Sequence, residues 1–513
     1  MLGSSPSRPM SSLGRTVLTV AAGAAFVAAV ALVGATQPPI SDSPGALARA
    51  GHGAAADVNP EAAEQGEQAQ EKIEAWQQAV ANGTAGQARP TGAAAALAAT
   101  GWAGEQAVDP LTDDWEPAIA ADRNSAYVYT LVTRYSGKPC SGNCPSPFIA
   151  LRISADGGTT WGTAKPLCAC KGTGQFDPII EVVPATTGPN AGAVYASYMN
   201  GYNIMFITST NHGATWSTPV PVYGTVSWND KPTIAVSDNG NDVYISFNGP
   251  TGGDPWMAQS HDSGATWTQT KLVDSNRYYF DFDSDVATDG TVYFAETSIL
   301  YGGGGNKGTT PTGQIEEHVF ISRDRGASWE NHTIGSVWPG IACVAAGCTP
   351  DYYLGHIALS VDGSNHVVAL FDGSTTAGGL QTISSERSID GGVSWSAPLT
   401  LSAAGETTDA PAVESRLNGD VRAWYYQTSG GGNVDAWNVW YRTSVDGGAS
   451  WTGAVKISDA TGGAAYKTAA GFGEVYGDYG ELAITNTGKS IAIWGEGTSY
   501  TGPGGVWFNR QSP

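Results

Sequence analysis

Hydrophobic and polar positions alternate in short runs along most of the chain. The runs 148–153, 204–208 and 438–442 are examples. A period of two places successive side chains on opposite faces of a sheet, so each run predicts a half-buried strand. A glycine-containing turn sequence follows each of these runs, and another strand-like run comes after the turn. The pattern therefore predicts a protein built from short antiparallel strands joined by hairpins.

The turn sequence itself is repeated. Six copies fit the pattern Ser-x-Asp-x-Gly-x-(Ser/Thr)-Trp, with Asn in place of Asp in the second copy alone. The copies begin at Ser154, Ser209, Ser260, Ser322, Ser388 and Ser444. They are spaced by about 51 to 66 residues, which indicates an array of similar structural units.

Each position of the repeated turn has a structural role. The Asp carboxylate can accept hydrogen bonds from backbone N–H groups a few residues later, and the Gly supplies a positive φ. The Ser or Thr adds a local side-chain bond, and the Trp buries a large ring in the next strand. We therefore predict a turn-building and non-catalytic role for Asp156, Asn211, Asp262, Asp324, Asp390 and Asp446.

Seven modules can be counted from acidic residues that precede short apolar strands. These openings lie at Asp114, Asp177, Asp230, Asp283, Asp351, Asp409 and Asp478. The seventh module ends after its third strand, which would leave an exposed sheet edge unless a segment within Glu105 to Leu111 supplied the missing strand. The fold prediction is all-β, a seven-bladed β-propeller of four-stranded antiparallel blades, with six blades as the alternative.

The repeated turn is similar to the Asp-box, also called the bacterial neuraminidase (BNR) repeat. The resemblance covers residues 105–513 and implies an Asp-box β-propeller of the sialidase-like superfamily. That group includes sialidases, other glycan-active enzymes and non-enzymatic members. The resemblance also implies that the boxes lie on the outer rim, away from the active centre.

The N-terminal part differs in composition from the repeats. Residues 1–35 contain Arg8 and Arg15 ahead of an apolar run that ends in small residues, which predicts a signal peptide. The run is long enough that an uncleaved membrane anchor remains the alternative. Residues 36–104 predict a flexible segment, with a helix at 60–80 because Ile73, Trp76 and Val80 recur at helical spacing.

Charge and cysteine content narrow the class of protein. The formal net charge of −22 argues against a nucleic-acid partner, because phosphate binding needs clustered Lys and Arg. Six cysteines fit an exported protein with disulfides, and Cys343 with Cys348 is the pair that we predict first. Cys140, Cys144, Cys168 and Cys170 either form further disulfides or, alternatively, bind a metal ion together.

Candidate chemistry follows from the predicted propeller. Its innermost strands line the axis, so acids at the start of these strands should meet at one opening. Carboxylates held close together acquire different pKa values, as acid-catalysed glycoside hydrolysis requires. The predicted catalytic acids are Asp283, Asp285, Asp351, Asp409 and Asp478. The predicted substrate-binding residues are Trp115, Trp228, Asp230, Tyr352, Tyr353 and Arg416. The alternative is that each Asp serves the scaffold.

Two segments also resemble sialidase strands. Residues 409–420 are similar to that family's Glu-bearing blade, and residues 476–484 to its Tyr-bearing strand, which implies that Glu414 activates Tyr479 as the nucleophile. The family's Arg-Ile-Pro signature is missing, and only Arg134, Arg277 and Arg416 are candidates for its carboxylate clamp.

These observations predict an exported glycan-active enzyme, a monomeric glycoside hydrolase that acts on a polysaccharide or glycoconjugate. A non-catalytic binding propeller is the first alternative, and an exo-sialidase is the second. No cofactor is required by this chemistry, although a cluster of Asp could hold Ca²⁺.

Overall fold

A computed structural model describes part of the chain. The described residues are Ala81, 99–109, 114–135, 137–168, 170–171, 174–226, 229–249, 253–302, 312–340, 355–428, 437–459, 480–497 and 504–512. The chain divides into Met1–Ser43 and Pro44–Pro513, and every described residue belongs to the second unit. The predicted signal peptide, the predicted helix at 60–80 and the predicted Cys343–Cys348 pair lie outside the described residues.

The described strands form seven four-stranded antiparallel sheets, so the seven-bladed prediction is confirmed and the six-bladed alternative is excluded. Blade 1 consists of β2 (Asp114–Ala121), β3 (Val128–Arg134), β4 (Phe148–Ser154) and β5 (Lys165–Pro166), and blade 2 of β6 (Gln175–Val182), β7 (Val194–Asn200), β8 (Ile204–Ser209) and β9 (Val220–Pro221). Blade 3 consists of β10 (Asp230–Val236), β11 (Val243–Asn248), β12 (Pro255–Ser260) and β13 (Thr268–Lys271), and blade 4 of β14 (Tyr278–Val286), β15 (Val292–Ile299), β16 (Ile315–Ser322) and β17 (Glu330–Val337). Blade 5 consists of β18 (Ile357–Val361), β19 (Val367–Gly373), β20 (Thr382–Ser388) and β21 (Leu399–Thr400), and blade 6 of β22 (Thr408–Leu417), β23 (Asp420–Thr428), β24 (Trp437–Ser444) and β25 (Val455–Lys456). Blade 7 consists of β26 (Glu481–Ile484), β27 (Ser490–Gly497), β28 (Gly504–Arg510) and β1 (Gln106–Ala107).

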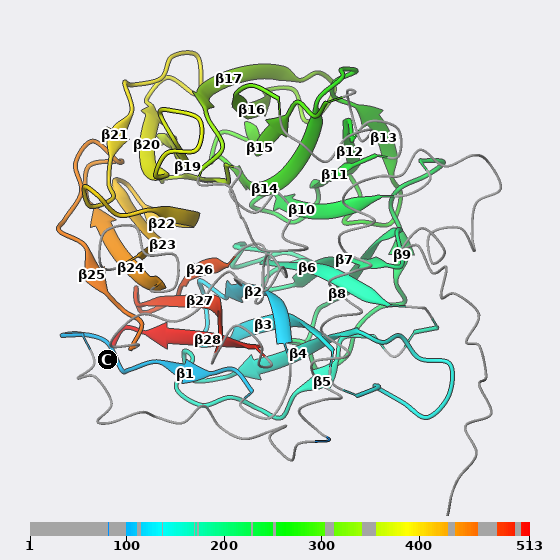
Figure 1. Ribbon diagram of the computed structural model, residues 1–513. Coiled ribbons are helices and arrows are strands. Elements are labelled where there is room, and N and C mark those ends of the chain that lie inside the picture. The colour runs from blue at the N-terminus through cyan, green and yellow to red at the C-terminus, as the bar shows by residue number, and fades with distance from the viewer. Residues whose placement is uncertain are drawn as a thin grey trace, which may run out of the picture. The chain divides into compact units, whose positions relative to one another are not determined.

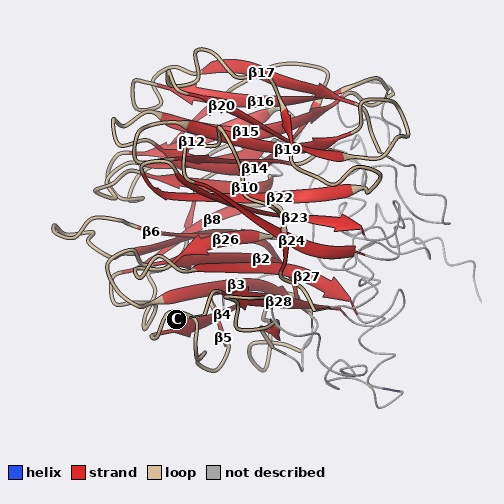
Figure 2. Cartoon of the chain, turned by 90° about the vertical axis from the view of Figure 1, so that its left-hand side faces the viewer, coloured by secondary structure: helices blue, strands red, loops and turns tan. Residues whose placement is uncertain are grey.

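The first strand of each blade is the innermost. These strands contact those of both neighbouring blades and enclose a common axis, as Figure 1 shows. Seen from the side, the strands run from one face of the ring to the other, and the described connections gather at the two ends (Figure 2). Among the described residues, no helix has the length and apolar character needed to cross a bilayer.

The ring closes through β1. This strand precedes blade 1 in the sequence but pairs with β28, with Gln106 opposite Phe508 and Ala107 opposite Trp507. An isolated bridge between Trp102 and Gln511 extends the contact. The prediction that a segment upstream of the first blade supplies the missing outer strand is therefore confirmed, and the last blade has no bare edge there.

The hydrophobic core is divided among the spaces between adjacent blades. Between blades 1 and 2, for example, Tyr129 and Leu131 pack with Ile180, Val182 and Val194. Equivalent clusters fill the spaces around the ring, including the one between blades 7 and 1. Each fully buried aliphatic side chain contributes about 1.5–3 kcal/mol, so the blades are held together face to face.

The repeated turns join the third and fourth strands and share one hydrogen-bond pattern. In the last copy, Ser444 Oγ donates to Asp446 Oδ1 and accepts from the N–H of Gly448. Ser450 donates its N–H to Oδ1 and its hydroxyl to Oδ2 of Asp446. In the second copy Asn211 Oδ1 accepts the N–H of Thr215, and its Nδ2 donates to the Thr215 hydroxyl. The pattern matches the predicted turn-building role.

The glycine of this turn also lies against the preceding blade. Gly158 has φ +79°, and a Cβ there would lie 2.6 Å from Ile491 of blade 7. The φ of Gly264 is +85°, and a Cβ there would collide with Phe206 of blade 2. Glycine is therefore required both for the turn conformation and for blade-to-blade packing.

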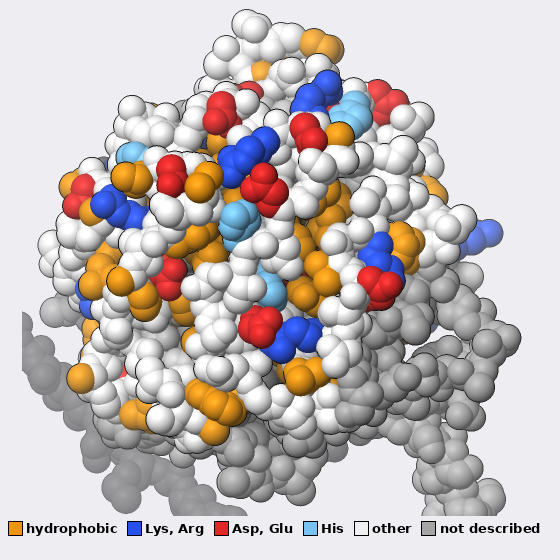
Figure 3. All heavy atoms as spheres, turned by 90° about the horizontal axis from the view of Figure 1, so that it is seen from above, with side chains coloured by type: hydrophobic (Ala, Val, Ile, Leu, Met, Phe, Trp, Pro, Cys, Tyr) orange, Lys and Arg blue, Asp and Glu red, His pale blue; other side chains and the backbone are white. Residues whose placement is uncertain are grey.

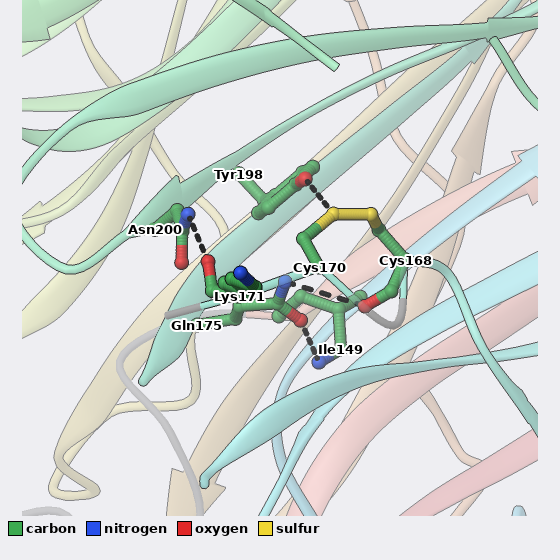
Figure 4. Close-up of a disulfide and its surroundings, with 7 residues drawn as sticks. All are labelled: Ile149, Cys168, Cys170, Lys171, Gln175, Tyr198 and Asn200. Atoms are coloured by element: carbon green, nitrogen blue, oxygen red, sulfur yellow. Dashed lines mark hydrogen bonds between the residues drawn. A yellow bond between two sulfur atoms is a disulfide. The ribbon is translucent and has the colours of Figure 1, made fainter. Parts of the chain in front are cut away.

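The four cysteines of blades 1 and 2 form disulfides, Cys140–Cys144 and Cys168–Cys170. Each sulfur is thus bonded, so the alternative of a metal site built from these four cysteines is wrong. Around the second disulfide, Gln175 Nε2 donates to the carbonyl of Cys168 and its Oε1 accepts the N–H of Ile149 (Figure 4). The disulfide loop is thereby fixed to strands of blades 1 and 2.

Candidate functional site

A cavity of about 140 Å³ runs along the axis and is lined by the innermost strands. We call it the axial cavity. Acidic side chains from blades 2, 3, 4, 6 and 7 line it, together with Arg123, Lys231 and His356. On the outer surface of the ring, viewed from the side of β17, acidic and basic side chains are mixed (Figure 3).

A β-bulge near the start of the innermost strand sets which residues face the cavity. In blades 1, 2, 3 and 6 the register shifts at a residue followed by proline. That residue has a positive φ in each case: Glu116 (50°), Asp177 (46°), Lys231 (46°) and Ala410 (40°). A side chain other than Gly rarely adopts this conformation, and bulges commonly re-aim side chains beside functional sites.

Three acids occupy matching places beyond the register shift. In β6, β14 and β22 pairing resumes after the shift at Ile179, Asp283 and Ala412. The residue two positions further along is an acid in each strand: Glu181, Asp285 and Glu414. All three line the cavity. We call them the axial acids. Alanines hold the same place in blades 1 and 3, at Ala120 and Ala235. The axial acids are thus a departure from the repeat and not a feature that every blade needs.

Several cavity carboxylates are bound to the backbone of the next blade. Asp283 Oδ2 accepts the N–H of Leu359 at 2.8 Å, and Asp285 Oδ2 accepts the N–H of Val361 at 2.7 Å. Glu481 Oε2 accepts the N–H of Ile119 at 2.5 Å, joining blade 7 to blade 1. These hydrogen bonds join neighbouring blades, which is the kind of contact that the alternative interpretation of the sequence gives to Asp283 and Asp285, and all three acids also line the cavity.

Arg123 lies beside Glu414 at the end of the cavity where the innermost strands finish. Its Nη2 is 3.2 Å from Glu414 Oε1 and also donates to the carbonyl of Ser415. The two side chains are 41% and 27% exposed, so this end of the cavity reaches solvent. The pair brings together blades 1 and 6, which are far apart in the sequence.

The pKa values of the axial acids are raised. Burial and the negative charge of Glu414 raise the pKa of Glu181 to about 8. Burial raises the pKa of Glu414 to about 7, while the Arg123 guanidinium opposes the shift. Burial also raises the pKa of Asp285, although the hydrogen bond from the backbone N–H of Val361 opposes the shift. A carboxyl group that is protonated near neutral pH can act as a general acid.

A second cluster lies where the innermost strands begin. His356 Nδ1 is 3.1 Å from Asp409 Oδ1 and 3.6 Å from Asp372 Oδ1. We call these residues the His356 cluster. Asp372 and Asp409 are fully buried, and His356 is 8% exposed and lines the cavity. The cluster joins blade 5 to blade 6.

Other predicted acids are dispersed. Arg134 holds Asp114 through two hydrogen bonds of 2.7 and 2.8 Å. Asp177 donates its own N–H to Glu116, and Asp230 accepts the N–H of Lys231. The openings that look equivalent in the sequence lie three, one and two residues before the bulge proline in blades 1, 2 and 3. A shift of one residue turns a strand side chain to the opposite face, so these acids do not form one ring.

The remaining predicted site residues fall into two groups. Trp115 is fully buried, with its ring centroid 5.8 Å from that of Tyr135, so it presents no face to a sugar. Arg416 donates to the carbonyls of Thr485 and Asn486. Six predicted residues lie outside the described part of the chain: Asp351, Asp478, Tyr479, Trp228, Tyr352 and Tyr353.

The three predicted arginines do not form the carboxylate clamp of a sialidase. Arg134 binds Asp114 in blade 1, whereas Arg277 donates to Ser298 and Gln314 in blade 4. Arg416, at the far end of β22, is engaged by backbone carbonyls. Each guanidinium already has its own partners, and none of the three lines the axial cavity.

Sequence reasoning missed Arg123, Glu181 and the partners of Asp409. The signal for Glu181 was present: it follows Pro178 at the same distance as Glu414 follows Pro411. Alignment of the innermost strands on this proline, and not on the first acid, would have found it. His356 and Asp372 carry no such signal, because they come from different parts of blade 5 and only the fold brings them to Asp409.

No family model matches the chain, and no curated protein matches it. Solved structures are similar in fold. An ulvan lyase of polysaccharide lyase family PL25 is 10% identical with a TM-score of 0.47, covering 77% of this chain and 94% of the lyase. The Hadza microbial sialidase Hz136 is 12% identical with a TM-score of 0.42, covering 75% and 76%. A Penicillium chrysogenum alpha-L-arabinanase in complex with arabinobiose is 11% identical with a TM-score of 0.40, covering 81% and 97%. At such identities the likeness concerns the fold alone, which the seven blades of this chain define independently.

Proposed function

We propose that the protein is an exported glycan-active enzyme, a glycoside hydrolase whose acid and base groups are Glu181 and Glu414 in the axial cavity. One observation carries the proposal. Two carboxyl groups from different blades share a water-accessible cavity, where burial raises both pKa values, to about 8 and about 7, and Arg123 donates a hydrogen bond to Glu414. Glycoside hydrolysis needs one protonated and one ionised carboxyl group on either side of the scissile bond.

The surroundings assign the two roles. Glu181 has the higher pKa and keeps its proton at neutral pH, so it is the general acid that protonates the leaving oxygen. Glu414 is held by Arg123 at 3.2 Å, which favours its ionised form. It acts as the base that activates water, or as the nucleophile. Asp285 adds negative charge close to both, which stabilises a cationic, oxocarbenium-like transition state.

The substrate class follows from the charge of the cavity. Arg123 and Lys231 are the Arg and Lys side chains among the described lining residues, against six carboxyl groups. Repulsion disfavours a glycan with dense carboxylate or sulfate groups, so a neutral glycan fits best. This proposal keeps Asp285 and Glu414 from the sequence prediction and adds Glu181 and Arg123. Asp283 is given a supporting role, Asp409 is given no role in this chemistry, and Asp351, Asp478 and Tyr479 remain candidates.

Export and a monomeric state form part of the proposal. Disulfides persist in oxidising compartments, and the described part of the chain has two of them and no free cysteine. Residues 1–35 are then the signal peptide, and 36–104 a segment ahead of the propeller domain at 105–513.

A non-catalytic glycan-binding propeller is the second candidate. The observation in its favour is that Asp283, Asp285 and Glu481 each accept a backbone N–H from the neighbouring blade. A cavity whose carboxylates all serve the scaffold would bind a ligand without turning it over.

The test compares wild type with Glu181→Gln and Glu414→Gln on a panel of neutral and acidic glycans, with product release as the readout. Loss of a general acid or base lowers kcat by about 10²–10⁴-fold. Glu330→Gln, at an outer strand with a 55% exposed side chain, is the matched control and should keep full activity. Turnover that survives both cavity substitutions would overturn the assignment. Binding to glycans without any turnover in wild type would favour the second candidate.

A further inference from the structure

The His356 cluster is distinct from the axial acids and has no role in the chemistry proposed above. It combines one imidazole with two carboxylates, a donor set that suits divalent metals such as zinc. His356 Nδ1 and one carboxylate oxygen of each Asp all lie within 4.8 Å of one another. All three residues are buried.

The spacing is that of ligands around one ion. With metal–ligand bonds of about 2.1 Å, adjacent ligand atoms lie about 3.0–3.4 Å apart. His356 Nδ1 lies 3.1 Å from Asp409 Oδ1 and 3.6 Å from Asp372 Oδ1. An ion at bonding distance from all three atoms therefore requires shifts of a few tenths of an ångström.

A second observation points to a ligand. His356 Nδ1 is buried and directed toward both carboxylates, with which it makes ion-pair contacts of 3.1 and 3.6 Å. Glu317, which is fully buried, has an unpartnered Oε1, while its Oε2 accepts from Thr297. A Cβ at Gly355 would collide with that Oε1, so the atom faces the residue that precedes His356. A buried polar atom without a partner is costly, and a cation bound by the imidazole and the carboxylates would satisfy the Glu317 oxygen.

The surroundings hold the donor atoms in place. Asp372 accepts the N–H of His356 at 2.6 Å on Oδ1 and the Nε2 of Gln381 at 2.7 Å on Oδ2. The ring of Phe282 lies 4.9 Å from the imidazole and restricts its rotation. Hydrogen bonds and packing of this kind orient ligands in metal sites.

We propose that His356, Asp372 and Asp409 bind one divalent metal ion of the zinc class, with Glu317 as an adjacent carboxylate. The ion joins blade 5 to blade 6, because two ligands come from the first and one from the second. His356 also lines the axial cavity, so a remaining coordination position can take water from that side. This inference does not depend on the proposed hydrolase activity.

The alternative is a protonated imidazole that forms ion pairs with both carboxylates and binds no metal. Isothermal titration of the chelator-treated full chain with ZnCl₂, checked by metal analysis after gel filtration, separates the two. The metal site predicts one equivalent of zinc, bound in the micromolar range or tighter, and a higher Tm with zinc present. His356→Gln and Asp409→Asn should each weaken binding at least tenfold to a hundredfold.

His366→Gln is the matched control, because His366 forms a similar pair with Asp362, 3.0 Å between Nδ1 and Oδ2, outside the cluster. It should leave zinc binding unchanged. Should either ligand variant fail to fold, Co²⁺ bound to wild type gives an independent readout, since a four-coordinate site of the zinc type gives Co²⁺ a much more intense visible absorption than the six-coordinate hydrated ion has. Absence of stoichiometric zinc binding by wild type, or Co²⁺ spectra equal to those of the hydrated ion, would overturn the proposal.

Discussion

Carboxylates occupy two regions of this propeller, the box turns on the rim and the axial cavity, and their environments are opposite. In the box turns, hydrogen bonds from the Ser or Thr hydroxyl and N–H lower the pKa of Asp262 and Asp390 to about 2. In the cavity, burial and mutual repulsion raise the pKa of Glu181 to about 8. The carboxyl group is thus ionised at neutral pH in the box turns, whereas at the axis it can gain or lose a proton near neutral pH.

The difference teaches how a repeat protein separates scaffold from chemistry. A box Asp receives its donors from the turn that it closes, so each copy is self-contained and can be repeated without change. The axial acids come from different blades and interact only because the ring is closed. Function in such a fold is expected where one blade departs from the others, as Glu181, Asp285 and Glu414 depart from Ala120 and Ala235.

The largest expected effect on stability is at Gly158, and the neighbouring Gly157 of the same box is its control. Gly158→Ala adds a Cβ 2.6 Å from Ile491 at φ +79°, so it should cost about 2–4 kcal/mol of unfolding free energy. Gly157→Ala, at φ +71° with nothing within 4 Å, should cost about 1 kcal/mol from backbone strain alone. Denaturant unfolding of both variants measures the contrast. Equal losses would show that the box does not act in blade packing.

Removal of the cavity guanidinium should alter the pH profile of activity. Arg123→Met deletes the charge that opposes the raised pKa of Glu414, so that pKa rises further and the acid limb of kcat/KM moves to higher pH. We expect a shift of about one pH unit, or roughly tenfold less activity at pH 6. Arg323→Met, on the rim beside Glu330, should leave the profile unchanged. An unshifted acid limb in Arg123→Met would contradict the role given to Glu414.

The two regions should also respond to pH with opposite signs. The folded-state pKa of Glu181 is raised from 4.5 to about 8, so the folded protein retains a proton that the unfolded chain loses. Its contribution to stability is present below pH 4.5 and declines as the pH rises toward 8. Glu181→Gln should therefore raise Tm by roughly 1–3 °C at pH 9 and by less at pH 5.

The rim gives the opposite dependence. The folded-state pKa of Asp390 is lowered from 3.8 to about 2, so its contribution is present above pH 4 and is lost as the pH falls toward 2. Asp390→Asn should lower Tm at pH 7 and have little effect near pH 2. Thermal scans of Glu181→Gln and Asp390→Asn between pH 2 and pH 9 measure the change in Tm of each variant. A change of the same sign in both variants would remove the distinction between the regions.

The smallest expected effect is in the one box that lacks an Asp. Asn211 already accepts the Thr215 N–H, so Asn211→Asp keeps that hydrogen bond, adds charge, and makes the Thr215 hydroxyl the donor where it now accepts from Nδ2. We expect a gain of a few tenths of a kcal/mol in unfolding free energy at pH 7. Denaturant titration measures it. A loss of stability would mean that this box differs from the others in more than its residue type.

The sequence was sufficient for the scaffold because the scaffold is local. The box turn, the strand alternation and the missing outer strand of the last module are all written in consecutive residues, and blade number and ring closure by β1 were predicted from them. The proposed site was predicted only in part. Glu414 and Asp285 were among the candidates, but Glu181 was hidden by alignment on the wrong residue. The contacts of Asp409 with His356 and Asp372 depend on register and closure, which no single segment encodes.

The most direct measurement is a titration of the cavity carboxyl groups themselves. The full chain is labelled with carbon-13 at the Glu side-chain carboxyl and followed by NMR from pH 4 to pH 10, with Glu181→Gln and Glu414→Gln to assign the two resonances. We predict that they titrate near pH 8 and pH 7. Titration of both near 4.5, the ordinary value for Glu, would contradict the claim that the axis holds proton-exchanging groups.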